Sequence, residues 1–159
     1  NKFQDNPESN AFQNKIRAIV NLKQVPKEMM KFTFDLTPVD FCAESIVKLA
    51  YYKVYNQIYH VLNSQEVSIE EIISLLKNIG INDIKQVDIV SNSSINNDIN
   101  YQWIINDLML NNKKKININS IKTQRILEKL NFKWDIPKKY YTNVLKDIVG
   151  GELNKRTNK

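Results

Sequence analysis

Residues 32–49, FTFDLTPVDFCAESIVKL, contain a strand pattern that runs directly into a helix pattern. Phe32, Phe34 and Leu36 alternate with polar residues, which is the period of a half-buried strand. From Thr37 onward the apolar residues recur at helical spacing, and this spacing predicts a helix that extends to about residue 50. A strand followed at once by a helix indicates a fold that mixes both kinds of element.

Thr37, Pro38 and Asp40 meet the local requirements for starting that helix. Thr37 as the N-cap would accept a hydrogen bond from a backbone amide of the first turn. Pro38 is tolerated at the first helical position because an N–H there would have no partner, and Asp40 at the third would complete a variant of the capping box. We therefore favour a structural role for these residues over a catalytic one.

The same periodicity predicts five further helices. They cover residues 11–23, 69–79, 99–110, a stretch from 121 and a stretch that Pro137 opens. Ser9 or Asn10, Ser68 and Ser120 are expected to cap three of them. Gly80 and the pair Gly150-Gly151 are expected to end two.

Two more strands are predicted, QIYHVL at residues 57–62 and a weaker pattern at 84–89. The order of elements predicts a helix-rich α/β or α+β fold. No stretch rich in Pro or Gly divides the chain. We expect a single lobe over residues 1–150, followed by a basic polar tail over residues 151–159.

The composition bounds the class of protein and its partners. The 159 residues carry a net charge of +6, which favours acidic partners through long-range attraction. Basic residues gather only at Lys113–Lys115 and in the tail, without the interleaved aromatics of single-strand binders, so we expect no nucleic-acid partner. No apolar stretch is long enough for a membrane span, the N-terminus is polar, and Cys42 is the only cysteine. A cytoplasmic protein without a membrane partner is expected.

Catalytic motifs are absent from the sequence. Three glycines cannot form the Gly-rich loop that holds a dinucleotide or a nucleoside triphosphate. One histidine and one cysteine cannot build a common zinc site. No tyrosine is followed by a lysine four residues later. We therefore predict no catalytic, cofactor-binding or metal-binding residue within this chain.

Three segments in order nevertheless resemble a known family. FTFDLTPVDFCAESIVKL and QIYHVLNSQEVSIEEIISLL are similar to consecutive strand–helix segments of extended short-chain dehydrogenase/reductases. The segment NKFQDNPESNAFQNKIRAIVNLKQVP resembles the one before them in the thioester reductase branch, which ends many nonribosomal peptide synthetases. The closing ILEKLNFKW and YYTNVLKDIVGG are similar to the last helices of that branch.

The resemblance implies the C-terminal, substrate-side lobe of such an enzyme, without its cofactor-binding Rossmann half. The family uses NADPH to reduce a thioester on the phosphopantetheine arm of a carrier protein, and it releases an aldehyde or an alcohol. The family's Gly-rich loop and its Tyr and Lys precede the matching region. The lobe is therefore expected to bind no cofactor and to be inactive alone. Its expected partners are the Rossmann half of the same polypeptide and an acidic acyl or peptidyl carrier protein.

The resemblance also suggests positions for a substrate site. Thr37, Pro38, Val39 and Phe41 would form a wall of the pantetheine or acyl channel, and Asp40 would hold the lobe to the cofactor domain. His60 and Asn63 match the family's Tyr-His-x-x-Asn stretch and would lie near the same cleft. The local alternative is that His60 packs in the interior and Asn63 forms a turn, and we favour it for both.

Lys113, Lys114 and Lys115 are the candidate docking site for the carrier, because a basic loop attracts an acidic partner. We also expect self-association of the isolated lobe, since residues 57–62 would leave an unpaired strand edge. Two alternatives stay open. One is a free-standing helical protein-interaction module, and the other, less favoured, is a basic nucleic-acid-binding domain.

Overall fold

The structure is a computed structural model that describes residues 10–52, 57–63, 65–88, 99–111 and 118–157. For residues 107–111 and 151–157 it describes the backbone alone. The elements in chain order are α1 (Ala11–Leu22), β1 (Gln24–Pro26), the 3-10 helix η2 (Lys27–Lys31), β2 (Thr33–Asp35), α2 (Val39–Tyr51), β3 (Glu66–Ser68), α3 (Ile69–Asn78), β4 (Lys85–Val87), α4 (Ile99–Asn111), α5 (Ile121–Lys129) and α6 (Lys138–Thr157). The predicted helix-rich fold that mixes helices and strands is confirmed.

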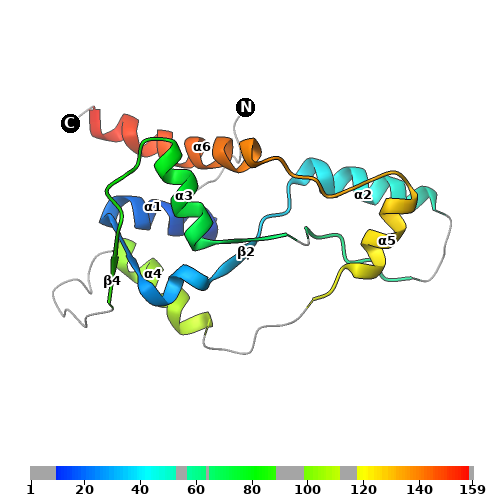
Figure 1. Cartoon of the computed structure of the whole chain (residues 1–159), viewed down its shortest axis with the longest axis horizontal. Helices are drawn as coiled ribbons and strands as arrows, with labels where there is room; N and C mark the ends of the chain where they lie inside the picture. The colour runs from blue at the N-terminus through cyan, green and yellow to red at the C-terminus, as the bar shows by residue number, and fades with distance from the viewer. Residues whose placement is uncertain (1–9, 53–56, 64, 89–98, 112–117, 158–159) are drawn as a thin grey trace. The chain divides into compact units, whose positions relative to one another are not determined.

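The elements form two compact units (Figure 1). The first contains α1, β1, η2, α3, β4, α4 and α6. The second contains β2, α2, α5 and most of β3. Each unit draws on stretches that are far apart in the sequence. The division into a lobe over residues 1–150 and a tail over residues 151–159 stays a prediction.

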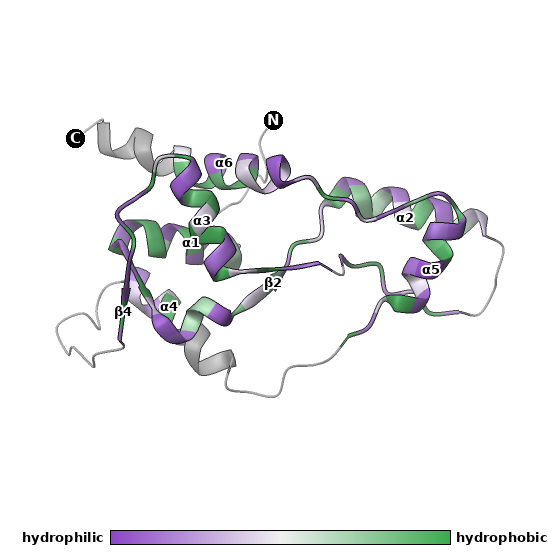
Figure 2. Cartoon of the chain, viewed as in Figure 1, coloured by the Kyte–Doolittle hydropathy of each residue, from purple (hydrophilic) through white to green (hydrophobic). Residues whose placement is uncertain are grey.

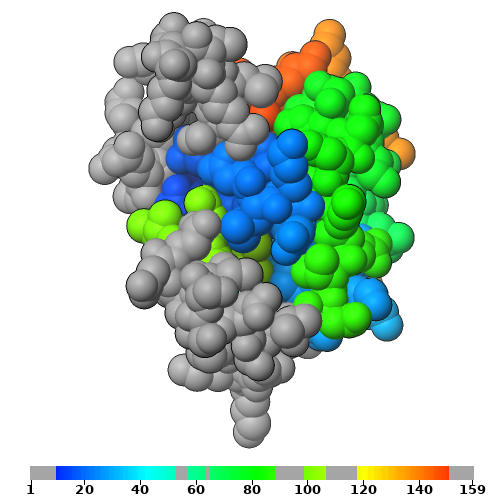
Figure 3. Space-filling view, turned by 90° about the vertical axis from the view of Figure 1, so that its left-hand side faces the viewer, coloured from blue at the N-terminus to red at the C-terminus, as the bar shows by residue number. Residues whose placement is uncertain are grey.

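The core of the first unit is formed by helices that pack on α1 and α3. α1 contacts α4 and α6, and α3 contacts α6 and η2. Figure 3 shows the blue residues around β1 and η2 lying against the green residues of α3 and β4. The largest fully buried side chains of this unit are Ile16, Ile19, Val25, Met29, Ile69, Ile72, Leu76 and Ile104.

Local sequence signals place the ends of α1 and α3 where they were predicted. The Asn10 side chain accepts a hydrogen bond from the backbone N–H of Gln13 at 3.0 Å, as an N-cap does. Ser68 and Glu71 form a complete capping box at the start of α3. Gly80 has φ +96°, the left-handed conformation that ends a helix.

Strand β1 pairs with β4 in parallel. The partners are Gln24 with Lys85, Val25 with Gln86 and Pro26 with Val87. Pro26 lies in an edge strand of this two-stranded sheet, where the missing N–H is tolerated. The predicted strand at 84–89 is thus confirmed over 85–87, and its last residue lies outside the described part of the chain.

The second unit is built around α2 and α5, which pack against each other. β2 pairs with β3 in a separate two-stranded sheet, and Thr33 Oγ1 donates to Glu66 Oε2 across it. The strand predicted from the alternation of Phe32, Phe34 and Leu36 is therefore confirmed over Thr33–Asp35. Phe41, from the first turn of α2, lies against two aromatic residues that follow α5, namely Phe132 and Trp134.

Three expectations about these elements are wrong. Residues 57–62 form no strand, because no strand of the described chain pairs with them. α6 continues past Gly150 to Thr157, since Gly150 does not adopt the left-handed conformation that Gly80 has. Ser120 precedes α5 without a side-chain cap, because its Oγ accepts a hydrogen bond from Gln124 Nε2 at 2.7 Å instead.

Candidate functional site

Asn63 joins the segment after β2 to the segment before β3. It is only 1% exposed, and its Nδ2 donates to the carbonyl oxygens of Leu36 at 3.2 Å and Gln65 at 2.9 Å. Its Oδ1 accepts from the backbone N–H of Gln65 at 3.0 Å, which is the bond of an Asx turn. Its own N–H donates to Thr37 Oγ1 at 3.0 Å. The predicted turn role of Asn63 is confirmed, and the amide also bridges two chain segments.

Thr37 takes part in this junction and not in the cap of α2. Its hydroxyl donates to Asp35 Oδ1 at 2.7 Å and accepts from the Asn63 N–H. α2 begins one residue later than predicted, at Val39, and its N-cap is Pro38, which makes no side-chain cap bond. The predicted capping box is therefore wrong, because the Thr37 hydroxyl is already bound to Asp35 and Asn63.

The other predicted channel residues separate into buried and exposed ones. Pro38 is buried. Phe41 is half-buried, with its ring stacked on Trp134 at 5.9 Å and edge-on to Phe132 at 6.0 Å between centroids. Val39 and Asp40 are exposed. The exposed Asp40 carboxylate lies in the first turn of α2, where its negative charge interacts favourably with the positive end of the helix dipole. A channel wall formed by these residues stays a prediction.

His60 lies at the N-terminal end of α5 and is exposed, so the expectation that it packs in the interior is wrong. Its backbone N–H donates to Thr123 Oγ1 at 3.0 Å, and its Nδ1 lies 3.2 Å from the Asn119 carbonyl oxygen. Nδ1 donates to this carbonyl only in the tautomer that carries a hydrogen there. The structure thus brings Thr37 and Asn63 together, and it ties His60 to α5.

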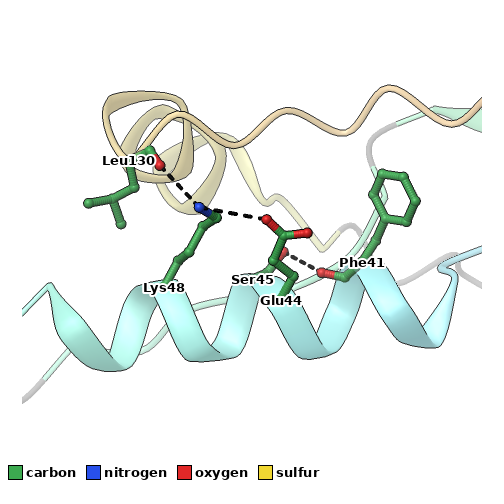
Figure 4. Close-up of polar contacts among 5 residues, drawn as sticks. All are labelled: Phe41, Glu44, Ser45, Lys48 and Leu130. Atoms are coloured by element: carbon green, nitrogen blue, oxygen red, sulfur yellow. Dashed lines mark hydrogen bonds and ion pairs between the residues drawn. The ribbon is translucent and has the colours of Figure 1, made fainter.

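Ser45 forms a hydrogen bond within α2, and Lys48 connects α2 to the end of α5 (Figure 4). Ser45 is fully buried and donates to the Phe41 carbonyl at 2.7 Å. Lys48 Nζ lies 3.4 Å from the Leu130 carbonyl oxygen and 3.6 Å from Glu44 Oε1. Phe41, Ser45 and Lys48 recur at spacings of four and three residues, and they lie on the inner face of α2.

A cavity of about 340 Å³ lies within the second unit. The residues that line it are Gln65, Gln124, Glu128, Phe132, Lys133, Trp134 and Asp135. Trp134 Nε1 is buried and has no hydrogen-bond partner within the described residues. The sequence analysis missed this cavity, although the two aromatics in NFKWD directly after α5 were a usable signal. Amide, charged and aromatic side chains together suit a small polar ligand with apolar parts.

Within the described chain, no group of three or more His, Cys, Asp or Glu side chains is placed to hold a metal ion. None of the helices searched there is both long enough and apolar enough to cross a membrane. Lys113, Lys114 and Lys115 lie outside the described residues, so the candidate carrier site stays a prediction.

The fold is similar to that of two solved reductase structures. A thiolation-reductase di-domain from an archaeal non-ribosomal peptide synthetase is 27% identical, with a TM-score of 0.76 over 94% of this chain. The reductase domain of the Aureusimine biosynthetic cluster is 22% identical, with a TM-score of 0.71 over 91% of this chain. These likenesses confirm the resemblance to a reductase domain that the sequence predicted. No protein-family model and no curated protein matches the chain.

The chain corresponds to only part of each of these proteins. It spans 32% of the archaeal chain and 39% of the Aureusimine chain. Most of each solved reductase therefore has no counterpart in the 159 residues.

Proposed function

We propose that this chain is the substrate- and carrier-binding lobe of a terminal thioester reductase. The intact enzyme would release an acyl or peptidyl group from a phosphopantetheine arm as an aldehyde or an alcohol. The supporting observation is the likeness to the archaeal thiolation-reductase di-domain, which extends over 94% of this chain at 27% identity. In that protein a thiolation domain and a reductase domain occur together.

The described residues do not fit NADPH, the hydride donor expected for the family. The chain has three glycines, and Gly80, the described glycine with a positive φ, serves to end α3. A dinucleotide needs a Gly-rich turn that lets the backbone approach its pyrophosphate. The proposal therefore assigns the cofactor to the Rossmann half of the same polypeptide, and the lobe alone is expected to be inactive.

The lobe's own contribution in this proposal is to bind and orient the substrate. Thr37 and Asn63 hold the segment before α2 in place through their shared hydrogen bond. Val39 and Asp40 are exposed beside it and are available to contact another part of the enzyme. His60 offers an exposed ring on the same unit. A fixed backbone that presents exposed side chains is a suitable support for a channel wall.

The acidic carrier would be attracted by the net charge of +6, with Lys113–Lys115 as its proposed docking site. A cytoplasmic location belongs to the same proposal, because synthetases of this kind draw on cytosolic substrates and cofactors.

The test uses the intact polypeptide that carries this chain, with an acyl-loaded carrier and NADPH. We expect loss of NADPH absorbance at 340 nm together with release of aldehyde or alcohol, identified by mass spectrometry. The 159-residue chain under the same conditions should release neither. Thioester release without NADPH oxidation would contradict the proposal. A polypeptide with no reductase activity and no carrier affinity would favour the interaction-module alternative.

A further inference from the structure

The helix α2 carries an apolar face that none of the described residues of its own unit covers. Its inner face packs on α5 and the residues after it, through Phe41, Ser45 and Lys48. The side chains on the opposite face are all exposed, and they recur at spacings of four, three, one and three residues. They are Val39, Ala43, Ile46, Val47 and Ala50.

The exposure of this face, which we call the free face of α2, is large. Val39 is 76% exposed, Ile46 54% and Val47 55%. Figure 2 shows hydrophobic residues recurring along the length of α2. Single exposed apolar residues are ordinary, but a contiguous stripe on one helix face marks an interaction surface.

Helix α3 shows what a solvent-facing helix of this chain looks like. Its inner face consists of isoleucine and leucine, as on other amphipathic helices. Its exposed residues are all polar: Glu70, Glu71, Ser74, Lys77 and Asn78. The free face of α2 departs from this pattern, although both helices belong to one chain.

The composition of the free face is typical of a permanent interface and not of a transient one. The face contains no basic residue, and its exposed neighbour Asp40 is acidic, so it offers nothing to attract an acidic carrier protein. Interfaces that stay assembled are more apolar than transient ones, because they are not exposed to water between encounters. An always-attached domain of the same polypeptide meets this requirement.

The unmatched part of each solved reductase is large enough to cover the free face of α2. The chain matches only 32% and 39% of those two proteins, so a body larger than this chain accompanies the matching part in each. We propose that the free face of α2 is the surface on which the nucleotide-binding part of the same reductase polypeptide packs. This inference rests on the proposed function, and it names the surface that joins the two parts.

Cysteine labelling tests the inference directly. Val47→Cys is introduced in a Cys42→Ser background, both in the intact polypeptide and in the 159-residue chain. Ile121→Cys is the matched control, since Ile121 is 53% exposed and also lies on a helix of the second unit. A maleimide should react with position 47 more slowly in the intact polypeptide, on the order of tenfold or more, because the site must open before it reacts. Position 121 should react at the same rate in both proteins.

Each other result overturns the inference. If the maleimide labels position 47 as fast in the intact polypeptide as in an isolated chain that shows no protection, the free face stays uncovered. Protection that grows with protein concentration identifies a second copy of the chain as the occupant. If labelling of position 47 is as slow in the dilute isolated chain as in the intact polypeptide, the chain covers the face by itself.

A second variant guards against misfolding of the cysteine protein. Ile46→Gln should lower the Tm of the intact polypeptide by about 3 °C or more and leave that of the isolated chain unchanged, since Ile46 is already exposed there. Ile118→Gln, at 55% exposure, should change neither. Equal effects of the two variants contradict the inference. Labelling needs no turnover, so protection without NADPH-dependent release would contradict the proposed function alone.

Discussion

Replacing Asn63 with alanine should destabilise the second unit by about 3 kcal/mol. The substitution removes three side-chain hydrogen bonds, to the Leu36 carbonyl, the Gln65 carbonyl and the Gln65 N–H. Each contributes about 1 kcal/mol net, and the carbonyls of Leu36 and Gln65 lose a partner. The backbone bond from position 63 to Thr37 is retained in the variant, so the loss belongs to the amide group.

Urea unfolding followed by circular dichroism measures the total loss, and hydrogen exchange of the peptides that contain residues 33–37 and 65–68 locates it. A loss of about 3 kcal/mol raises the population of the open junction by a factor of roughly 150. Asn143→Ala is the matched control, because Asn143 is exposed on α6 and alanine favours helix there. A change below about 1 kcal/mol for Asn63→Ala, or equal changes for both variants, would refute the reasoning.

Three further predictions concern the cap of α3, the aromatic cluster and the carrier. Ser68→Ala should cost about 1 kcal/mol in urea unfolding because it breaks the capping box, whereas Ser74→Ala on the exposed face of the same helix should cost almost nothing. Phe41→Ala should destabilise the second unit by about 2 kcal/mol and shift the emission of Trp134 to longer wavelength; an unchanged spectrum would contradict the stacking. Replacing Lys113–Lys115 with glutamate should weaken carrier binding at low salt, measured by calorimetry, and unchanged affinity would exclude this loop as the docking site.

The local parts of the fold could be predicted because their causes lie within a few residues. Asn10 caps α1 through an amide three residues away, and Ser68 with Glu71 does the same for α3. Gly80 ends α3 because glycine has no side chain to oppose a positive φ. Such signals need no distant partner, so sequence reasoning placed them correctly.

The candidate site could be predicted only in part. Asn63 was expected to form a turn, and it does. The partner of Thr37 was missed, because its hydroxyl binds Asn63, which lies 26 positions away, and not the helix amide next to it. The cavity beside Trp134 was also missed, because its lining joins Gln65 to residues that follow it by about sixty or more positions.

The amino-acid sequence alone was enough to locate the helical segments of this protein, several of their ends and the side chains that share a helix face. Those properties follow from backbone propensity and from the 3.6-residue period. The tertiary structure decided which face of α2 is covered, because Phe41 meets Phe132 and Trp134 more than ninety positions away. It also decided that residues 24–26 pair with 85–87, while no strand of the described chain pairs with residues 57–62. A strand exists only where another segment supplies its hydrogen bonds, and periodicity carries no information about that partner.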